Sequence, residues 1–285
     1  MSALELVANY HCQVGENPLW DEREGRLYWV DIDSGRLFRI EHESGEHECF
    51  HHNPDKIGGF TFQDDGSLLL FEVDRIATLG KDGKRRVIAE QLDSGMVRFN
   101  DVIADPEGRV FAGTIGKTDD SGALHRIDLD GSVVTMWRGT GCANGMGFSP
   151  DLKHFYWTCS TTYRIFVSDY QRETGALANR RVFHRAAREQ GIPDGMAVDR
   201  QGQVWSARWD GSALLRLNAQ GEVAERMPLP VGRVSSVAFG GPQLDTLYVT
   251  TAGGTWQGST PDEGALYRAE APVPGAVEFR SRILL

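Results

Sequence analysis

The sequence has little cysteine, and its cysteines are far apart. No two of them form a C-x-x-C pair, so the chain has neither a zinc knuckle nor a dithiol redox motif. The four are Cys12, Cys49, Cys142 and Cys159. Free, buried thiols are expected, because no histidine accompanies them in a pattern that indicates a nucleophile.

Long apolar runs are also missing. The longest unbroken apolar stretches, such as Leu68 to Phe71, are far shorter than the roughly 20 residues of a transmembrane helix. The first residues, Met-Ser-Ala-Leu-Glu-Leu-Val, lack the basic segment followed by an apolar one that is typical of a secretory signal. The sequence therefore predicts a cytoplasmic protein without a membrane-spanning helix.

Positive charge is scarce relative to negative charge. No basic run offsets the net charge of −10, which argues against binding to nucleic acid or to an anionic membrane. A neutral substrate is easier to accommodate. With 40% hydrophobic residues, the 285-residue chain can form a sizeable core in one large domain or two small ones.

A repeat runs through the whole chain. Six times, a short apolar strand, a polar turn and a second apolar strand follow one another, which is the sequence form of a β-hairpin. The turns lie roughly 41 to 49 residues apart, the length of a propeller blade. Their equivalent positions are Gly25, Gly66, Gly108, Lys153, Gly202 and Asp245.

The repeat predicts an all-β fold. Further strands follow each hairpin, so each unit has room for four strands, and we expect a six-bladed β-propeller with four-stranded antiparallel blades around a central channel. The alternative is a β-sandwich or two β domains with accidental periodicity. No linker-like stretch divides the chain, so residues 1–285 are interpreted as a single propeller domain.

Polar residues recur at one offset in this repeat, just before the first strand of each unit. The first strands line the channel of a propeller, so side chains from different blades can converge on one ligand there. Four of the six carry oxygen atoms that bind a cation or a polyol, although each alone is equally typical of a strand-end cap. The six are Glu16, Gly58, Asn100, Asn144, Asp194 and Ser236.

At these residues the chain resembles the SMP-30/gluconolactonase/regucalcin family over essentially its full length. The matching segments are Gly15-Glu-Asn-Pro-Leu-Trp20, Arg98-Phe-Asn-Asp101, Asp105-Pro-Glu-Gly-Arg109, Ala112-Gly-Thr114, Asn144-Gly145, Ile192-Pro-Asp-Gly-Met196 and Phe239-Gly-Gly241. The resemblance implies metal-dependent hydrolysis of an aldonic acid lactone. The ion implied is a single Ca²⁺, Zn²⁺, Mn²⁺, Mg²⁺ or Fe²⁺.

The resemblance also implies roles for particular residues. Glu16, Asn144 and Asp194 correspond to the metal ligands, and Asp194 also to the general base. Arg98 and Asn100 correspond to the pair that holds the oxygens of the substrate. A cation would polarise the lactone carbonyl and acidify a water, whereas ligation would lower the basicity of Asp194.

Two departures from the family pattern bear on specificity. Thr118 lies in the segment where some members carry a glutamate that contacts substrate, so we assign Thr118 to the substrate site and leave the preferred sugar open. Cys159 stands where many members have an aspartate. The expected metal ligands are nevertheless all present.

Three alternatives remain open at this point. Histidines cluster at His42, His47, His51 and His52, but they lack the i, i+4 helical spacing of a zinc protease. The same channel chemistry would also serve an esterase or phosphotriesterase. A third possibility is a non-enzymatic propeller that binds a metal or a protein partner.

Overall fold

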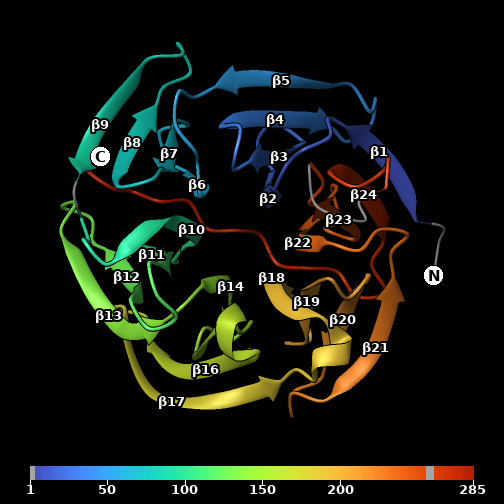
Figure 1. Cartoon of the computed structure of the whole chain (residues 1–285). Helices are drawn as coiled ribbons and strands as arrows, with labels where there is room; N and C mark the ends of the chain where they lie inside the picture. The colour runs from blue at the N-terminus through green and yellow to red at the C-terminus, as the bar shows by residue number, and fades with distance from the viewer. Residues whose placement is uncertain (1–3, 91, 255–259) are drawn as a thin grey trace.

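The computed structural model describes residues 4–90, 92–254 and 260–285. Six four-stranded antiparallel sheets are arranged in a ring (Figure 1), so the predicted six-bladed β-propeller is confirmed. Blade one comprises β2 (Gly15–Asp21), β3 (Arg26–Asp31), β4 (Arg36–Glu41) and β5 (His47–His52). Blade two comprises β6 (Gly59–Phe62), β7 (Leu68–Phe71), β8 (Arg75–Leu79) and β9 (Arg85–Glu90).

The other blades repeat this pattern. Blade three comprises β10 (Met96–Ala104), β11 (Val110–Gly116), β12 (Gly122–Ile127) and β13 (Val133–Thr140). Blade four comprises β14 (Ala143–Phe148), β15 (His154–Cys159), β16 (Arg164–Gln171) and β17 (Ala176–Arg185). Blade five comprises β18 (Ile192–Val198), β19 (Val204–Trp209), β20 (Ala213–Leu217) and β21 (Val223–Pro228). Short 3₁₀ turns, Ser160–Thr162 and Arg188–Gln190, lie before β16 and β18.

Blade six closes the ring with both ends of the chain. Its inner three strands are β22 (Val234–Gly240), β23 (Thr246–Thr251) and β24 (Ala265–Glu270), and its outermost strand is β1 (Glu5–Asn9). β1 pairs antiparallel with β24. Blade six is therefore built from strands that lie at opposite ends of the strand order, β1 and β22 to β24.

The predicted turn positions all lie between the first and second strands of a blade. Gly66 and Gly108 adopt φ of +85°, a left-handed conformation that costs other residues energy because of their Cβ. The glycines of the repeat therefore fix the hairpins that set the blade length.

The first strands of the six blades form the wall of the central channel. Each of β2, β6, β10, β14, β18 and β22 contacts the first strands of both neighbouring blades. Large apolar side chains of the second strands fill the space between blades, and Trp29, Trp157 and Trp205 are almost completely buried there. Burial of such residues is the main driving force for stacking the blades.

A C-terminal segment (residues 271–285) crosses the middle of the ring (Figure 1). Its backbone hydrogen bonds reach four different blades, through Gly275 N to Leu244 O at 2.9 Å, Ser281 N to Phe62 O at 2.8 Å, Arg282 N to Gly108 O at 2.8 Å and Arg200 N to Pro274 O at 2.9 Å. All of these contacts lie where the first strands end, so the segment covers one face of the ring. Within the described residues, no helix is long and apolar enough to cross a membrane.

Candidate active site

A cavity of about 280 Å³ lies at the face of the ring where the first strands begin, opposite the C-terminal segment. Strands of blades one, three, four and five supply its polar groups. Its lining consists of Val14, Glu16, Ile32, Asp33, Arg98, Asn100, Ile115, Cys142, Asn144, Ser160, Ile192, Asp194 and Trp209. The structure thus brings together all but one of the site residues predicted from the sequence.

The polar residues lie inside the first strands rather than just before them. The pairing between first and second strands shifts register at these points, between Glu16 and Leu19, between Phe99 and Val102, between Asn144 and Met146, and between Pro193 and Met196. A β-bulge of this kind turns a side chain away from the alternation of a regular strand. The bulges therefore allow strand residues to point along the channel.

Glu16, Asn144 and Asp194 bring three oxygen-bearing side chains from three blades to one place. All three are buried, with exposed fractions of 6%, 5% and 6%. The Asn144 amide nitrogen donates to Asp194 Oδ1 and, at 3.3 Å, to Ser160 Oγ. Glu16 Oε2 accepts the Asn17 backbone N–H at 2.8 Å.

Burial raises the pKa of Glu16 well above its ordinary value, and the negative charges of Asp194 and Asp101 raise it further. Burial likewise raises the pKa of Asp194, with Asp101 adding to the effect and the Asn144 hydrogen bond opposing it. Two carboxylates are thus held close together with too little positive charge around them. Such a pair is stabilised by binding a cation.

Arg98 and Asn100 form a second polar pair on β10. Arg98 Nη1 donates to Asn100 Oδ1 at 2.7 Å and to Phe99 O at 2.8 Å. Asn100 Nδ2 donates to Ala143 O at 3.0 Å, which links β10 to β14. Burial lowers the pKa of the Arg98 guanidinium. One edge of this guanidinium is therefore fixed, and its remaining N–H groups are available to a ligand.

Glycines after Asn144 and Asp194 allow the first strands to approach closely. A Cβ atom on Gly145 would lie 2.4 Å from Asp194 O, and one on Gly195 would lie 2.1 Å from Ser236 Oγ. Neither distance is compatible with a side chain. The Asn-Gly and Asp-Gly pairs of the sequence thus combine a polar side chain that lines the cavity with the close strand contact that positions it.

Thr118 is placed apart from the other predicted residues. It is exposed in the loop between β11 and β12, where its hydroxyl donates to Asp120 Oδ1 at 2.6 Å, and it does not line the cavity. Cys159 is buried in the core of blade four, and Ser160 beside it faces the cavity and donates to Pro193 O at 2.8 Å.

Several cavity residues were not assigned from the sequence. Asp33, Cys142 and Trp209 line the cavity, as do the apolar residues Ile32, Ile115 and Ile192. Ile32, Asp33 and Cys142 lie just outside strands, whereas Ile115, Ile192 and Trp209 lie at strand ends, and the repeat alone does not distinguish these positions from others like them. For Trp209, the position directly before the turn at Asp210 and Gly211 does indicate a contact at the rim of the channel.

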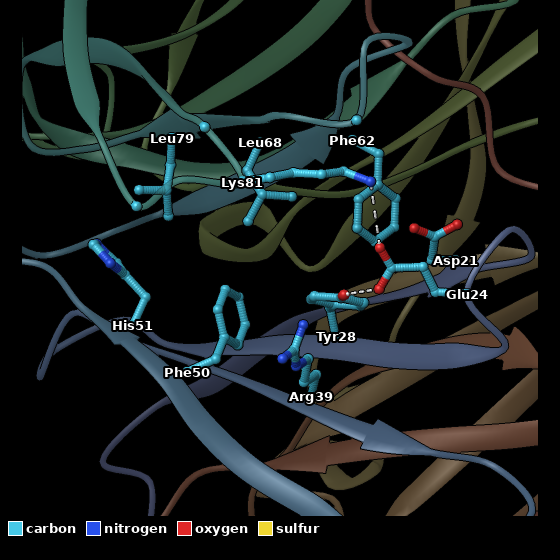
Figure 2. Close-up of a pocket in the computed structure, with 13 residues that line it drawn as sticks. Asp21, Glu24, Tyr28, Arg39, Phe50, His51, Phe62, Leu68, Leu79 and Lys81 are labelled. Atoms are coloured by element: carbon cyan, nitrogen blue, oxygen red, sulfur yellow. Dashed lines mark hydrogen bonds and ion pairs between the residues drawn. The ribbon is translucent and has the colours of Figure 1, made fainter.

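The sequence cluster of histidines lies elsewhere. His51 lines a separate pocket of about 310 Å³ between blades one and two, together with aromatic residues of both blades (Figure 2). In that pocket the Tyr28 hydroxyl donates to Glu24 Oε2 at 2.5 Å, and Lys81 Nζ lies 3.7 Å from Glu24 Oε1. His42 is engaged with the Tyr248 hydroxyl at 2.8 Å. These contacts are structural ones at the periphery of the ring.

In the described part of the chain, no three His, Cys, Asp or Glu side chains gather in a metal-binding arrangement. The candidate cation site accordingly depends on the amide of Asn144 as well as on the two carboxylates. Oxygen donors of this kind favour hard cations such as Ca²⁺ and Mg²⁺.

Comparison with known proteins identifies related chains of nearly equal length. A pentonolactonase of Haloferax volcanii is 46% identical, with 98% of each chain covered. A 6-deoxy-6-sulfogluconolactonase of Pseudomonas putida is 32% identical, with 96% of this chain and 97% of the relative covered. The solved structure of a luciferin-regenerating enzyme superposes with a TM-score of 0.89 at 27% identity and covers 99% of both chains.

The family model of the SMP-30/gluconolactonase/LRE-like region matches residues 14–253. That span includes all the strands that supply the cavity. The resemblance predicted from the sequence segments is therefore confirmed, and this chain belongs to the SMP-30/gluconolactonase/LRE-like family.

Proposed function

We propose that this protein is a divalent-metal-dependent lactonase that hydrolyses the cyclic ester of an aldonic acid. The observation that carries the proposal is the convergence of Glu16, Asn144 and Asp194 with Arg98 and Asn100 around one cavity. The names of the 46% and 32% identical relatives, a pentonolactonase and a sulfogluconolactonase, support sugar lactones as the substrate class.

Glu16, Asn144 and Asp194 are the proposed ligands of the metal. Their fit rests on the two buried carboxylates, whose raised pKa values reflect uncompensated negative charge. The Asn144 amide oxygen accepts from Gly145 N at 3.1 Å and its nitrogen faces Asp194, so ligation requires this amide to turn. Waters would complete the shell, as is usual for hard cations.

A divalent cation bound there supplies a Lewis acid for the lactone carbonyl and lowers the pKa of a bound water. Arg98 is proposed to donate to the carbonyl oxygen as it becomes an oxyanion, because its guanidinium is already oriented by Asn100 and Phe99 O. Asn100 contributes a donor and an acceptor to the hydroxyl groups of the sugar.

Asp194 is the proposed general base. Its carboxylate accepts a proton from the attacking water and returns it to the ring oxygen as the acyl C–O bond breaks, which leaves the open-chain acid. The raised pKa of the Asp194 carboxyl in the absence of a cation favours this proton uptake, whereas metal ligation opposes it. Ile32, Ile115, Ile192 and Trp209 form the apolar part of the wall.

The direct test is a pH-indicator assay of lactone hydrolysis with and without EDTA. Pentonolactones head the panel because of the 46% identical relative, followed by glucono- and galactonolactone. We expect turnover that EDTA abolishes and added Ca²⁺, Mg²⁺, Mn²⁺ or Zn²⁺ restores. Hydrolysis of none of these lactones under any metal would refute the proposal, and faster turnover of a phosphotriester would favour the esterase alternative.

Thr118 remains a proposed substrate contact that rests on its place in the sequence segment alone. Its loop is exposed, and contact with a substrate in the cavity requires the loop to move. A Thr118→Ala variant with unaltered KM for every lactone of the panel would exclude it from the site.

A further inference from the structure

Asp33 contributes a third carboxylate to the candidate active site, at the mouth of the cavity. Among the described residues of the lining, Arg98 is the only cationic one, and the acidic ones are Glu16, Asp33 and Asp194. The Asp33 side chain is 30% exposed, whereas Glu16 and Asp194 are buried. Asp33 therefore lies nearer to solvent than the two carboxylates that are proposed to hold the metal.

The turn that carries Asp33 is held on both sides by backbone hydrogen bonds. It joins β3 to β4, and it lies at the face of the ring where β2 begins, because β2 and β3 are antiparallel. On one side of Asp33, Ile32 N donates to Val14 O at 2.9 Å. On the other side, Asn53 N donates to Gly35 O at 2.8 Å. The backbone therefore presents the carboxylate to the cavity in a fixed position.

Within the described residues, only one of the two carboxylate oxygens of Asp33 has a hydrogen-bond partner. Lys56 Nζ donates to Asp33 Oδ1 at 2.7 Å. The Lys56 side chain is half exposed and does not line the cavity, so it approaches the carboxylate from outside. Asp33 Oδ2 remains an acceptor for a ligand in the cavity, and an ionised oxygen forms strong hydrogen bonds with hydroxyl groups.

The charge balance of the cavity bears on which substrates it accepts. Under the proposed function a divalent cation offsets Glu16 and Asp194, which leaves the Arg98 guanidinium and the Asp33 carboxylate as the remaining charges of the lining. These two act on each other, since burial lowers the pKa of Arg98 and the charge of Asp33 is among those that oppose this effect. Without Asp33 the cavity with its cation would be positively charged and would attract anions.

We propose that Asp33 is a specificity-determining residue that selects uncharged sugar lactones. Its second oxygen accepts a hydrogen bond from a hydroxyl group on the side of the lactone away from the carbonyl, and its charge repels a sulfonate, phosphate or carboxylate substituent on that side. The carbonyl binds deeper in the cavity, beside Arg98. This inference rests on the proposed lactonase function and adds to it the charge of the preferred substrate.

The first experiment compares gluconolactone with a gluconolactone that carries a sulfonate at carbon 6. The parent protein is expected to favour the uncharged lactone roughly tenfold or more in kcat/KM. Asp33→Asn should raise kcat/KM for the sulfonated lactone about tenfold, because a like charge is removed. It should also raise KM for gluconolactone about threefold, because a charged hydrogen bond becomes a neutral one. A ratio of the two kcat/KM values that Asp33→Asn leaves unchanged overturns the proposal.

Two further variants separate the local charge from other effects. Asp74→Asn removes an equal charge from the turn between β7 and β8, and because Asp74 is 47% exposed and lies outside the cavity lining, the ratio should stay within about twofold. Lys56→Gln removes the cation beside Asp33 and should shift the ratio further against the sulfonated lactone. Shifts of the same sign in Asp33→Asn and Lys56→Gln would indicate a disturbed turn and overturn the proposal.

Calorimetric binding provides a readout besides turnover. Asp33→Asn should tighten the binding of sulfonated gluconate relative to gluconate about tenfold, while metal affinity stays within about threefold. A large loss of metal affinity would make Asp33 a metal ligand and overturn the proposal. Absence of metal-dependent turnover of either lactone by the parent protein would refute the proposed function and this inference with it, whereas turnover with a ratio that Asp33→Asn does not change refutes the inference alone.

Discussion

The carboxyl groups of Glu16 and Asp194 are both buried, and burial raises the pKa of each and disfavours its ionised form. Replacing either by its amide, as in Glu16→Gln or Asp194→Asn, should lower metal-dependent lactone turnover by at least about a hundredfold, because a cation loses a charged ligand. Turnover and calorimetric metal affinity are to be measured on both variants.

The same substitutions should leave the metal-free fold intact, with a far-UV CD spectrum unchanged and Tm in EDTA equal to or above that of the parent. Each removes a carboxylate whose pKa is raised by burial first and by nearby negative charge second, so the neutral amide is easier to bury. Full turnover in either variant would remove that residue from the metal site.

Arg98 is expected to act on substrate rather than on the metal. Arg98→Ala should lower lactone kcat/KM roughly ten- to a hundredfold, the effect of losing a charged hydrogen bond of about 1.5 to 3 kcal/mol. Metal affinity should stay nearly constant. Arg98→Lys is the matched control, since it keeps the charge but not the fork that reaches Asn100 Oδ1. Unaltered kinetics in Arg98→Ala would contradict this role.

Arg208 on β19 is a buried cation, and we expect its replacement to stabilise the protein. It is 0% exposed, its three guanidinium nitrogens have no partner within the described residues, and burial lowers its pKa to about 10. An unpaired buried charge of this kind is destabilising. Arg208→Met should therefore raise the free energy of unfolding by about 1 to 3 kcal/mol in urea titrations, and a clear decrease would indicate a compensating anion at the guanidinium.

At the residue scale, the fixed offset in the repeat singles out four of the polar residues that line the cavity, Glu16, Asn100, Asn144 and Asp194. Ser236 is present in the same pattern, but nothing in its spacing indicates that it faces a different part of the channel from Asn100 and Asp194. That depends on the bulges, which one sequence does not reveal. Asp33 could not be predicted for a similar reason, since it follows β3 in a turn whose path the repeat does not specify.

At the scale of elements, the close contact between β14 and β18 predicts that a larger residue at Gly145 disturbs the site. In Gly145→Ala the new Cβ would lie 2.4 Å from Asp194 O, so the two strands must separate and carry Asn144 away from Asp194. Overpacking of this kind costs about 1 to 3 kcal/mol of stability, and we expect metal affinity to fall at least tenfold.

Gly232→Ala provides the matched control for that variant. The only described contact of its new Cβ within 4 Å is the flexible end of Glu263 at 3.1 Å, so Tm and metal affinity should change little. Equal effects of the two substitutions would show that the contact between β14 and β18 does not position the ligands.

The strands themselves were the most predictable elements. The alternation of apolar residues and the glycine turns determine the hairpins locally, and the apolar run Ala213-Leu-Leu-Arg-Leu217 forms β20. Strand starts were less predictable, because Glu16 and Asp194 lie within β2 and β18 rather than before them. A bulged start keeps its backbone pairing while losing the side-chain alternation on which such predictions depend.

At the scale of the whole molecule, the number of blades follows from the repeat, whereas the C-terminal segment does not. Residues 271–285 have no counterpart in the other units, and their contacts with blades far away in sequence leave no periodic signal. The pairing of β1 with β24 is similarly non-local. Local patterns thus predicted the blades but not the C-terminal segment or the pairing of β1 with β24, which connect parts of the ring that are distant in sequence.

Deleting residues 271–285 tests how much the segment contributes. The deletion removes several backbone hydrogen bonds and the buried side chain of Ile283, together worth roughly 5 kcal/mol. Tm should fall by about 10 °C or more, as measured by differential scanning calorimetry in EDTA. A Tm unchanged by the deletion would mean that the six blades hold the ring without the segment.

The pairing of β1 with β24 also has a consequence in time. During synthesis β1 is made long before its partner β24 (Ala265–Glu270), because all the other strands lie between them in the sequence. Until then blade six lacks its outer pair and the apolar flanks of blades one and five, which the finished blade covers, face the surroundings. The ring therefore closes only after β24 has been synthesised, and contacts of such long range fold slowly and expose apolar surface to other chains while they form.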